Sequence, residues 1–445
     1  MHFSISIILG IILALAALVA IAIVCIAGLS QVLSVAQALT GLDLGAARTE
    51  KVLVMNDIHY ISPKLTDGGA YFTNMVTNSD GKTMLVMEAL ATAFIDQVLA
   101  EAPTTLIIAG DITFNGAKQS HLDFAEHLTR LTDAGISVYT LPGNHDLNCG
   151  YAACFAGDGY TRVESVSNEE FREIYAPFGY AGESLMAADE HSLSYMARLS
   201  EDKALLMIDC NHDISGILSD ETIAFAEAQL IAAQQAGMQV IAVSHQSLMD
   251  HNSMLSFGYT MLHAEELLAL YEKYNVICNL SGHVHMQHIA NSEGGFADIA
   301  TSALSVYPNQ YGVLHWSNDN VSYETAAVEL PLWNESSEAI ATGYETFAAY
   351  SEAFFQSDHS GQFTEALCAD FTTAEIAAMT DWASETNLYY FAGRRDLITP
   401  DEDTLTALTE SGVFFGSYLA TIFEDELVDD TKWSSEIPET DSTQS

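Results

Sequence analysis

The sequence predicts an α/β fold in which a layered central domain follows an N-terminal membrane helix and precedes an all-helical C-terminal domain. Short runs of apolar, β-branched residues alternate with segments of helical periodicity along residues 51–330, as in layered α/β domains. An apolar run lies ahead of this region, and beyond residue 331 the strand pattern gives way to segments rich in Ala, Leu, Glu and aromatic residues. The predicted divisions are a membrane segment (1–30), a linker (31–50), a central domain (51–330), a helical domain (331–424) and an acidic tail (425–445).

The first predicted element is the membrane helix. Residues 7–29 are almost wholly apolar, and no Asp, Glu, Lys or Arg precedes Asp43. A span needs about 20 residues, whereas a cleaved signal has an apolar core of about 7–15 residues behind a basic flank. We therefore expect an uncleaved anchor, with secretion after signal cleavage as the alternative.

The large excess of acidic residues narrows the possible binding partners and cellular location of the protein. The chain has 14 Lys plus Arg against 60 Asp plus Glu, a net charge of −46 at pH 7. Proteins that bind nucleic acid carry basic stripes that neutralise phosphates, so this composition excludes duplex nucleic acid as a partner. The few basic residues near the anchor slightly favour a cytoplasmic body, but the acidic excess suits an exported one better. We expect a membrane-anchored protein with an extracellular central domain.

The elements of the central domain follow in order. Strands are predicted at residues 51–55, 105–109, 137–141, 240–243 and 275–280, and helices at residues 82–100, 121–134, 219–237 and 263–274. Four more strands, at residues 287–291, 296–301, 312–316 and 321–328, are expected to close the domain as a β-meander.

The C-terminal part is predicted to be helical at residues 335–355, 363–367, 374–390 and 401–423. Beyond residue 424 the composition is acidic and rich in Ser and Thr, which is typical of a solvated tail.

Residues that can hold metal ions follow each of the first five predicted strands. These segments are Asp57-Ile58-His59, Gly110-Asp111, Gly143-Asn144-His145-Asp146, His245 and Gly282-His283-Val284-His285. In an open α/β sheet the loops beyond the carboxyl ends of the strands form the ligand crevice, so the five loops can converge on one place. Mixed Asp, Asn and His side chains suit divalent manganese, iron or zinc. We expect the glycines before them to serve tight turns.

In this order the five segments resemble the calcineurin-like metallophosphoesterase superfamily across roughly residues 50–330. The resemblance implies a layered metallophosphoesterase β-sandwich flanked by helices. It also implies two divalent metal ions that activate water for attack on a phosphate ester.

The same resemblance implies a role for each residue. Asp111 would bridge the two ions. The other ligands would divide between a first ion, with Asp57, His59 and His285, and a second ion, with Asn144, His245 and His283. His145 would protonate the leaving oxygen or bind a phosphate oxygen, and Asp146 would orient the imidazole of His145.

The segment from Gly110 to Gly116, with Ser120-His121 after it, resembles the exported cyclic-nucleotide-phosphodiesterase-like branch of Gram-positive bacteria. Purple acid phosphatases place a tyrosinate ligand where this chain has Phe114. The resemblance implies hydrolysis of cyclic nucleotides or similar small phosphodiesters. The alternatives are a phosphomonoesterase, a cell-envelope phosphodiesterase acting on teichoic acid or phospholipid, and a non-catalytic metal-binding scaffold.

Three features leave alternatives open. Cys149 and Cys154 could form a disulfide in an oxidising compartment or remain free. Among the other histidines, expected to be bystanders, His212 and His251 are the candidates for touching substrate. The aromatic residues of segments 157–192 and 252–259 could stack on a base or fill a local core.

Overall fold

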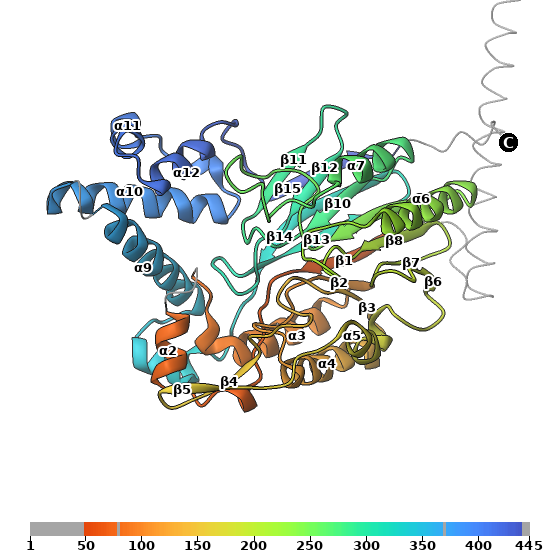
Figure 1. Ribbon diagram of the computed structural model, residues 1–445, viewed down its shortest axis with the longest axis horizontal. Helices are drawn as coiled ribbons and strands as arrows, with labels where there is room; N and C mark the ends of the chain where they lie inside the picture. Colours follow the sequence, from red (N-terminus) through yellow and green to blue (C-terminus); the bar gives the residue numbers. More distant parts are fainter. Residues whose placement is uncertain (1–48, 78–80, 368–370, 438–445) are drawn as a thin grey trace, which may run out of the picture. The chain divides into compact units, whose positions relative to one another are not determined.

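Two β-sheets that pack against each other form the centre of the protein, seen here in a computed structural model that describes residues 49–77, 81–367 and 371–437 (Figure 1). The predicted membrane helix (1–30) and nearly all of the predicted linker (31–50) lie outside the described residues. The anchor and the extracellular location therefore stay predictions. Among the helices that are described, none is both long and apolar enough to cross a membrane.

The first sheet has six strands in the order β15-β14-β13-β1-β2-β3, and β1, β2 and β3 are parallel. Its strands are β1 (Glu50–Met55), β2 (Thr105–Ala109), β3 (Ser137–Leu141), β13 (Gln310–Trp316), β14 (Asn320–Ala327) and β15 (Lys432–Glu436).

The second sheet has seven strands in the order β11-β12-β10-β9-β8-β7-β6, and β8, β9, β10 and β12 are parallel. Its strands are β6 (Leu185–Ala188), β7 (Tyr195–Arg198), β8 (Lys203–Ile208), β9 (Gln239–Ser244), β10 (Cys278–Ser281), β11 (His288–Asn291) and β12 (Ala297–Ala300). A separate hairpin consists of β4 (Ala153–Ala156) and β5 (Gly159–Arg162).

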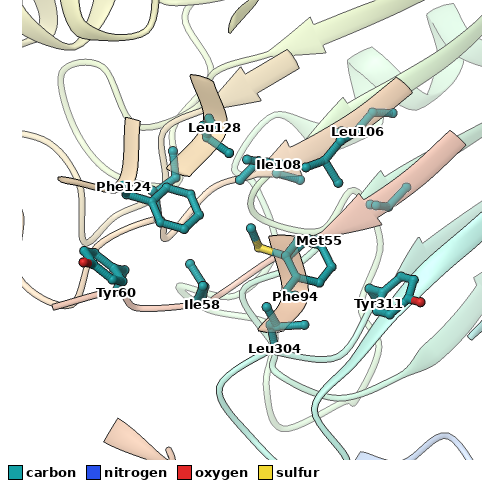
Figure 2. Close-up of a cluster of buried hydrophobic side chains, with 14 of the residues drawn as sticks. Met55, Ile58, Tyr60, Phe94, Leu106, Ile108, Phe124, Leu128, Leu304 and Tyr311 are labelled. Atoms are coloured by element: carbon teal, nitrogen blue, oxygen red, sulfur yellow. The ribbon is translucent and has the colours of Figure 1, made fainter. Parts of the chain in front are cut away.

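The alternation of side chains along β8 shows how the layers form. Leu205 and Met207 join the main core between the sheets, whereas Leu206 and Ile208 join a second core on the other face of the sheet. Because successive strand residues point to opposite faces, a strand buried on both sides must be apolar throughout. Figure 2 shows part of the main core, where side chains from strands, helices and loops meet.

The helices of the central domain pack around the two sheets. The bounds of these helices are α2 (Ala70–Val76), α3 (Met87–Glu101), α4 (Lys118–Asp133), α5 (Asn168–Ile174), α6 (Asp220–Gln235) and α7 (Ala264–Lys273). Helix α4 contacts β3, α6 contacts β8 and β9, and α2 lies against the β4–β5 hairpin. Phe124, Leu128 and Leu131 give α4 the apolar stripe that buries it in the main core. Ala226 and Leu230 of α6 pack into the second core. Short 3-10 turns lie at η1 (Pro63–Leu65), η2 (Met84–Val86), η3 (Ala176–Phe178), η4 (Trp333–Glu335) and η5 (Arg395–Leu397).

The C-terminal region is helical, as predicted. Its helices are α8 (Ser337–Thr342), α9 (Phe347–Leu367), α10 (Thr373–Phe391), α11 (Glu402–Glu410) and α12 (Phe414–Ile422). A capping box between Thr372 and Glu375 begins α10. One helix, α9, runs where the sequence predicted two separate segments, and Phe363 within it packs with Leu419 of α12 in a third core.

Two predictions about the end of the chain are wrong. The four closing strands do not form a meander, because β11 and β12 belong to the second sheet whereas β13 and β14 belong to the first. The region predicted as a solvated tail contains β15, which pairs antiparallel with β14. Trp433 of β15 packs against the main core, which explains why this polar segment is ordered.

Candidate metal centre

Five of the seven predicted metal ligands have a left-handed backbone. These are Asp57 (φ 51°), His59 (φ 49°), Asp111 (φ 46°), His283 (φ 67°) and His285 (φ 60°). Non-glycine residues rarely adopt this conformation, and such residues cluster at functional sites, where the surrounding structure holds them in place. The parallel strands β1, β2 and β10 thus end in sharp turns that carry these ligands, and the two other predicted ligands follow β3 and β9.

The first ligand group consists of Asp57, His59, Asp111 and His285, whose ligand atoms all lie within 4.8 Å of one another. The Nε2 atoms of His59 and His285 are 3.2 Å apart. His285 Nε2 lies 3.6 Å from Asp57 Oδ1, and His59 Nε2 lies 3.7 Å from Asp111 Oδ2. Bonds of about 2.1 Å to one ion place neighbouring ligands about 3.0–3.4 Å apart, so the group is close to the spacing of a shared metal ion.

The second ligand group consists of Asp111, His245 and His283, again within 4.8 Å. His245 Nε2 lies 3.3 Å from Asp111 Oδ1 and 3.1 Å from Asn144 Oδ1, which adds Asn144 to the group. Asp111 belongs to both groups, with Oδ2 toward the first and Oδ1 toward the second. The cluster is consistent with a dimetal site, and the geometry supports the bridging position predicted for Asp111.

Backbone carbonyls fix the orientation of two ligand rings. His245 Nδ1 lies 2.9 Å from the Ala109 carbonyl oxygen, and His283 Nε2 lies 2.9 Å from the Gly258 carbonyl oxygen. Because a carbonyl can only accept, we assign the N–H to these ring nitrogens. The other nitrogen of each ring is left to bind a metal, the arrangement that metal-binding histidines adopt in proteins.

Buried polar atoms test whether divalent cations fit this place. Asp57 Oδ1 is buried without a hydrogen-bond partner among the described residues, although a buried carboxylate requires compensation of its charge. Burial raises the pKa of Asp111, but His245 and His145 outweigh burial and hold that pKa well below its ordinary value. Burial lowers the pKa of His245, yet Asp111, Asp57 and the Ala109 carbonyl together outweigh burial and raise this pKa to about 9. The carboxylates thus attract positive charge, and two cations would supply it.

Glycines let the loops approach one another closely. A Cβ at Gly143 would meet Asp111 Oδ1 and His245 Nε2, and a Cβ at Gly282 would lie 2.6 Å from Asp57 Oδ2. Gly110 combines a φ of 92° with close approach to the His245 ring. These glycines therefore serve both turn formation and convergence of the ligands.

The structure places His145 at the centre but contradicts the role predicted for Asp146. His145 Nε2 lies 4.0 Å from Asp111 Oδ2, and its Nδ1 lies 2.9 Å from the Phe114 carbonyl oxygen, which orients the ring. Asp146 instead accepts hydrogen bonds from the backbone N–H groups of Ile112, Thr113 and Gly143 and from the Thr113 hydroxyl, at 2.8–3.0 Å. It ties the loop after β2 to the loop after β3, because its carboxylate is turned away from the imidazole toward these donors.

Sequence reasoning did not anticipate three contributors to the site: the Ala109, Phe114 and Gly258 carbonyls, which carry no side-chain signal. It also missed Lys82, which is 6% exposed. Burial lowers the pKa of His59 well below its ordinary value, Asp111 opposes this, and the charge of Lys82 lowers the pKa further. Lys82 is far in sequence from every motif, so no local pattern could identify it.

The structure distinguishes the alternatives for the cysteines, His251 and the aromatic segments, whereas contact of His212 with substrate stays a prediction. Cys149 and Cys154 are free thiols. His251 is 3% exposed and lies against His288, with 2.9 Å between their Nδ1 atoms, so it is not placed to touch substrate. The Nδ2 of Asn168 lies 3.0 Å from the ring of His212, at the edge of α5. The aromatic residues of segment 157–192 are mostly core. Phe257 and Tyr259 of segment 252–259 are exposed, and the Tyr259 ring lies beside His283.

Comparisons with known proteins identify two families that the sequence matches. Residues 50–287 match the family described as calcineurin-like phosphoesterase, and residues 331–429 match the C-terminal domain of cyclic nucleotide phosphodiesterase. A solved dimetal phosphatase from Danio rerio is similar at 12% identity and a TM-score of 0.45, over 62% of this chain and 95% of that one. A purple acid phosphatase from yellow lupin (Lupinus luteus) seeds is similar at 16% identity and a TM-score of 0.40, over 64% of this chain and 52% of that one. No curated protein matches the chain.

Proposed function

Because the chain belongs to the calcineurin-like phosphoesterase family, we propose that this phosphoric ester hydrolase is a dinuclear-metal-dependent phosphodiesterase acting on cyclic nucleotides or similar small phosphodiesters. The observation that carries the proposal is the position of Asp111, whose carboxylate belongs to both ligand groups. A non-catalytic scaffold would have no need for a complete ligand set together with His145.

Two sets of residues would hold the ions. Asp57, His59, Asp111 and His285 form one set, and Asp111, Asn144, His245 and His283 form the other. When bound, the two ions activate water for attack and place positive charge against the oxygens of the phosphoryl group. Imidazole nitrogens with carboxylate and amide oxygens favour manganese, iron or zinc.

His145 is the residue we propose as proton donor to the leaving oxygen. The hydrogen bond from its Nδ1 to the Phe114 carbonyl leaves Nε2 facing the centre, where the ring can hold the transferred proton. Its side chain is 33% exposed, so substrate can reach it.

A diester substrate is supported by the C-terminal region. Residues 331–429 resemble the C-terminal domain of cyclic nucleotide phosphodiesterase, which favours a cyclic nucleotide over a monoester. Monoesters and teichoic acid or phospholipid diesters of the cell envelope are the alternatives, and the same assay distinguishes them.

The first experiment tests the bridge and the acid. Manganese-loaded full-length protein should hydrolyse cyclic AMP and bis(4-nitrophenyl) phosphate, and Asp111→Asn should abolish both activities because it removes the shared carboxylate. His145→Ala should slow cyclic AMP hydrolysis by about 10²–10⁴-fold while both metals remain bound. It should slow release of 4-nitrophenolate less, because this leaving group needs little protonation. Product formation and metal content are measured.

Asp158→Asn, in an exposed turn, serves as the control and should keep full activity. Undiminished activity of Asp111→Asn would contradict the assignment of the site. Loss of metal in His145→Ala would make His145 a ligand. Turnover of 4-nitrophenyl phosphate or an envelope polymer in preference to both diesters would replace the proposed substrate class.

A further inference from the structure

The loop at residues 252–260 carries two exposed aromatic side chains and contacts the candidate metal ligand His283. The Gly258 carbonyl oxygen lies 2.9 Å from His283 Nε2, so the loop contacts the centre directly. Phe257, beside Gly258, is 88% exposed. The Tyr259 ring, 37% exposed, lies 5.4 Å from the His283 ring between centroids. The Tyr259 ring thus lies at the edge of the second ligand group, and Phe257 is an exposed aromatic side chain two residues before it.

The helical C-terminal region holds this loop. Asn252 is 5% exposed, and its Nδ2 donates to Thr421 Oγ1 at 2.7 Å and to the Tyr390 hydroxyl at 3.0 Å. Thr421 belongs to α12 and Tyr390 to α10, and Figure 1 shows the chain before α7 beside α12. Ser253 adds a hydrogen bond of 2.7 Å to Glu424. These contacts tie the start of the loop to two helices outside the central domain.

The two substituents of a diester would lie on different sides of the centre. His145, the proposed proton donor, packs beside His59 of the first ligand group, with 4.8 Å between ring centroids. His283 packs beside His245 of the second group, with 5.0 Å between ring centroids. The group that leaves phosphorus therefore belongs near His145, and the substituent that stays on phosphorus can extend toward His283.

We propose that Phe257 and Tyr259 form a subsite for a planar aromatic substituent that stays on phosphorus, such as a nucleobase-bearing group, and that Asn252 is the positioning residue that holds this subsite in place. The inference rests on the proposed function, since it concerns the substrate of the same site. Aromatic side chains stack on planar groups through their faces, and each such contact strengthens binding by about fivefold or more.

The test compares two diesters that release the same 4-nitrophenolate. The manganese-loaded full-length protein is assayed with bis(4-nitrophenyl) phosphate, which keeps an aryl group on phosphorus, and with methyl 4-nitrophenyl phosphate, which keeps a methyl group. The Phe257→Ala/Tyr259→Ala variant should lose about tenfold or more in kcat/KM on the first, mainly through KM, and less than twofold on the second. Tyr259→Phe should retain activity because it keeps the ring.

The positioning role of Asn252 is tested in the same assay. Asn252→Ala and Thr421→Val should show the same selective loss for the aryl substrate, and a thermal melt of each variant confirms that it is folded. Phe414→Ala, at a Phe that is 60% exposed at the start of α12, serves as the matched control and should behave like wild type on both diesters. Equal loss of Phe257→Ala/Tyr259→Ala on both diesters, or no loss on either, would overturn the subsite. The same result for Asn252→Ala would overturn its positioning role.

A binding measurement separates this inference from the proposed function. Calorimetry with phenylphosphonate and methylphosphonate on the same manganese-loaded protein should show preference for the phenyl compound, and the double variant should lose that preference. Wild type that hydrolyses neither diester but prefers phenylphosphonate would contradict the proposed function and support the subsite. Equal affinity of wild type for both phosphonates would overturn the subsite whatever the activity.

Discussion

Five candidate metal ligands combine a side chain that can bind a divalent cation with a backbone conformation that is rare for residues other than glycine. Asp57, His59, Asp111, His283 and His285 supply ligand atoms from left-handed positions, which cost about 1–3 kcal/mol each for a non-glycine residue. The surrounding hydrogen bonds offset this strain: the backbone N–H of His283 donates to Asp57 Oδ2 at 2.9 Å, and that of His145 donates to Asp111 Oδ1 at 2.8 Å. The ligands therefore hold one another in place across loops.

The burial of His121 predicts that the stability of the protein depends on pH. It is fully buried between Tyr175 and the Asp146 carbonyl, and burial lowers its pKa from 6.5 to about 4. Because the unfolded chain binds a proton at higher pH than the folded chain does, stability falls as pH drops from about 6.5 toward 4. Urea unfolding should show that His121→Gln loses about 1–3 kcal/mol less than wild type across this range. His315→Gln, on the exposed side of β13, should keep the wild-type slope, and an unchanged slope in His121→Gln would contradict the prediction.

Among the elements, the edge of the first sheet is the least expected. β15 pairs with β14 over five residue pairs, from Asn320↔Glu436 to Glu324↔Lys432. Without it, β14 would present unpaired backbone groups, a template for association with other chains. Trp433 adds apolar burial to this pairing, so the strand covers an edge and completes the core.

Truncation tests the importance of β15. A chain that ends after residue 430 should lose about 1–3 kcal/mol in the free energy of unfolding and aggregate more readily, because it removes the Trp433 contact and exposes β14. A chain that ends after residue 437 keeps the strand and serves as the control. Equal melting temperatures and equal monomer content by size-exclusion chromatography would show that β15 contributes nothing.

At the scale of the whole molecule, the helical region contacts the central domain at two places next to the centre. Asp358 of α9 accepts a hydrogen bond of 2.9 Å from the backbone N–H of Gly81, the neighbour of Lys82. Thr421 and Tyr390 hold Asn252 at the start of the loop that reaches His283. The segment beside Lys82 and the loop that contacts His283 are thus both linked to helices far along the chain.

Metal binding should stabilise the whole molecule because the ligands come from both sheets. Manganese at 100 times its Kd adds about 2.7 kcal/mol per site, which should raise the melting temperature by several degrees over the chelator-treated protein. Asp111→Asn should lose most of this increase, since it removes a ligand from both groups. Asp158→Asn should keep it. A melting temperature that does not respond to manganese in wild type would argue against a metal site here.

The sequence by itself determined the α/β class, the helical C-terminal region and the candidate metal-ligating residues with their places at strand ends. These follow from local properties: periodicity reports which faces are buried, and ligand identity is read directly from the residue type. It could not determine which sheet β11 to β14 join, nor that Lys432–Glu436 forms a strand, because strand pairing depends on segments far apart in sequence.

Only the tertiary structure decided the roles of Asp146, Phe114, Gly258 and Lys82. A carboxylate next to a histidine in sequence can accept from the imidazole or from nearby backbone N–H groups. The packing of the loops after β2 and β3 places the Asp146 carboxylate against backbone N–H groups. Backbone carbonyls are the same in every residue, so their use by His145 and His283 has no sequence signal. Residue chemistry identifies the candidate ligands in the sequence. The groups that orient them come from loops far apart in the chain, so only the folded structure shows them.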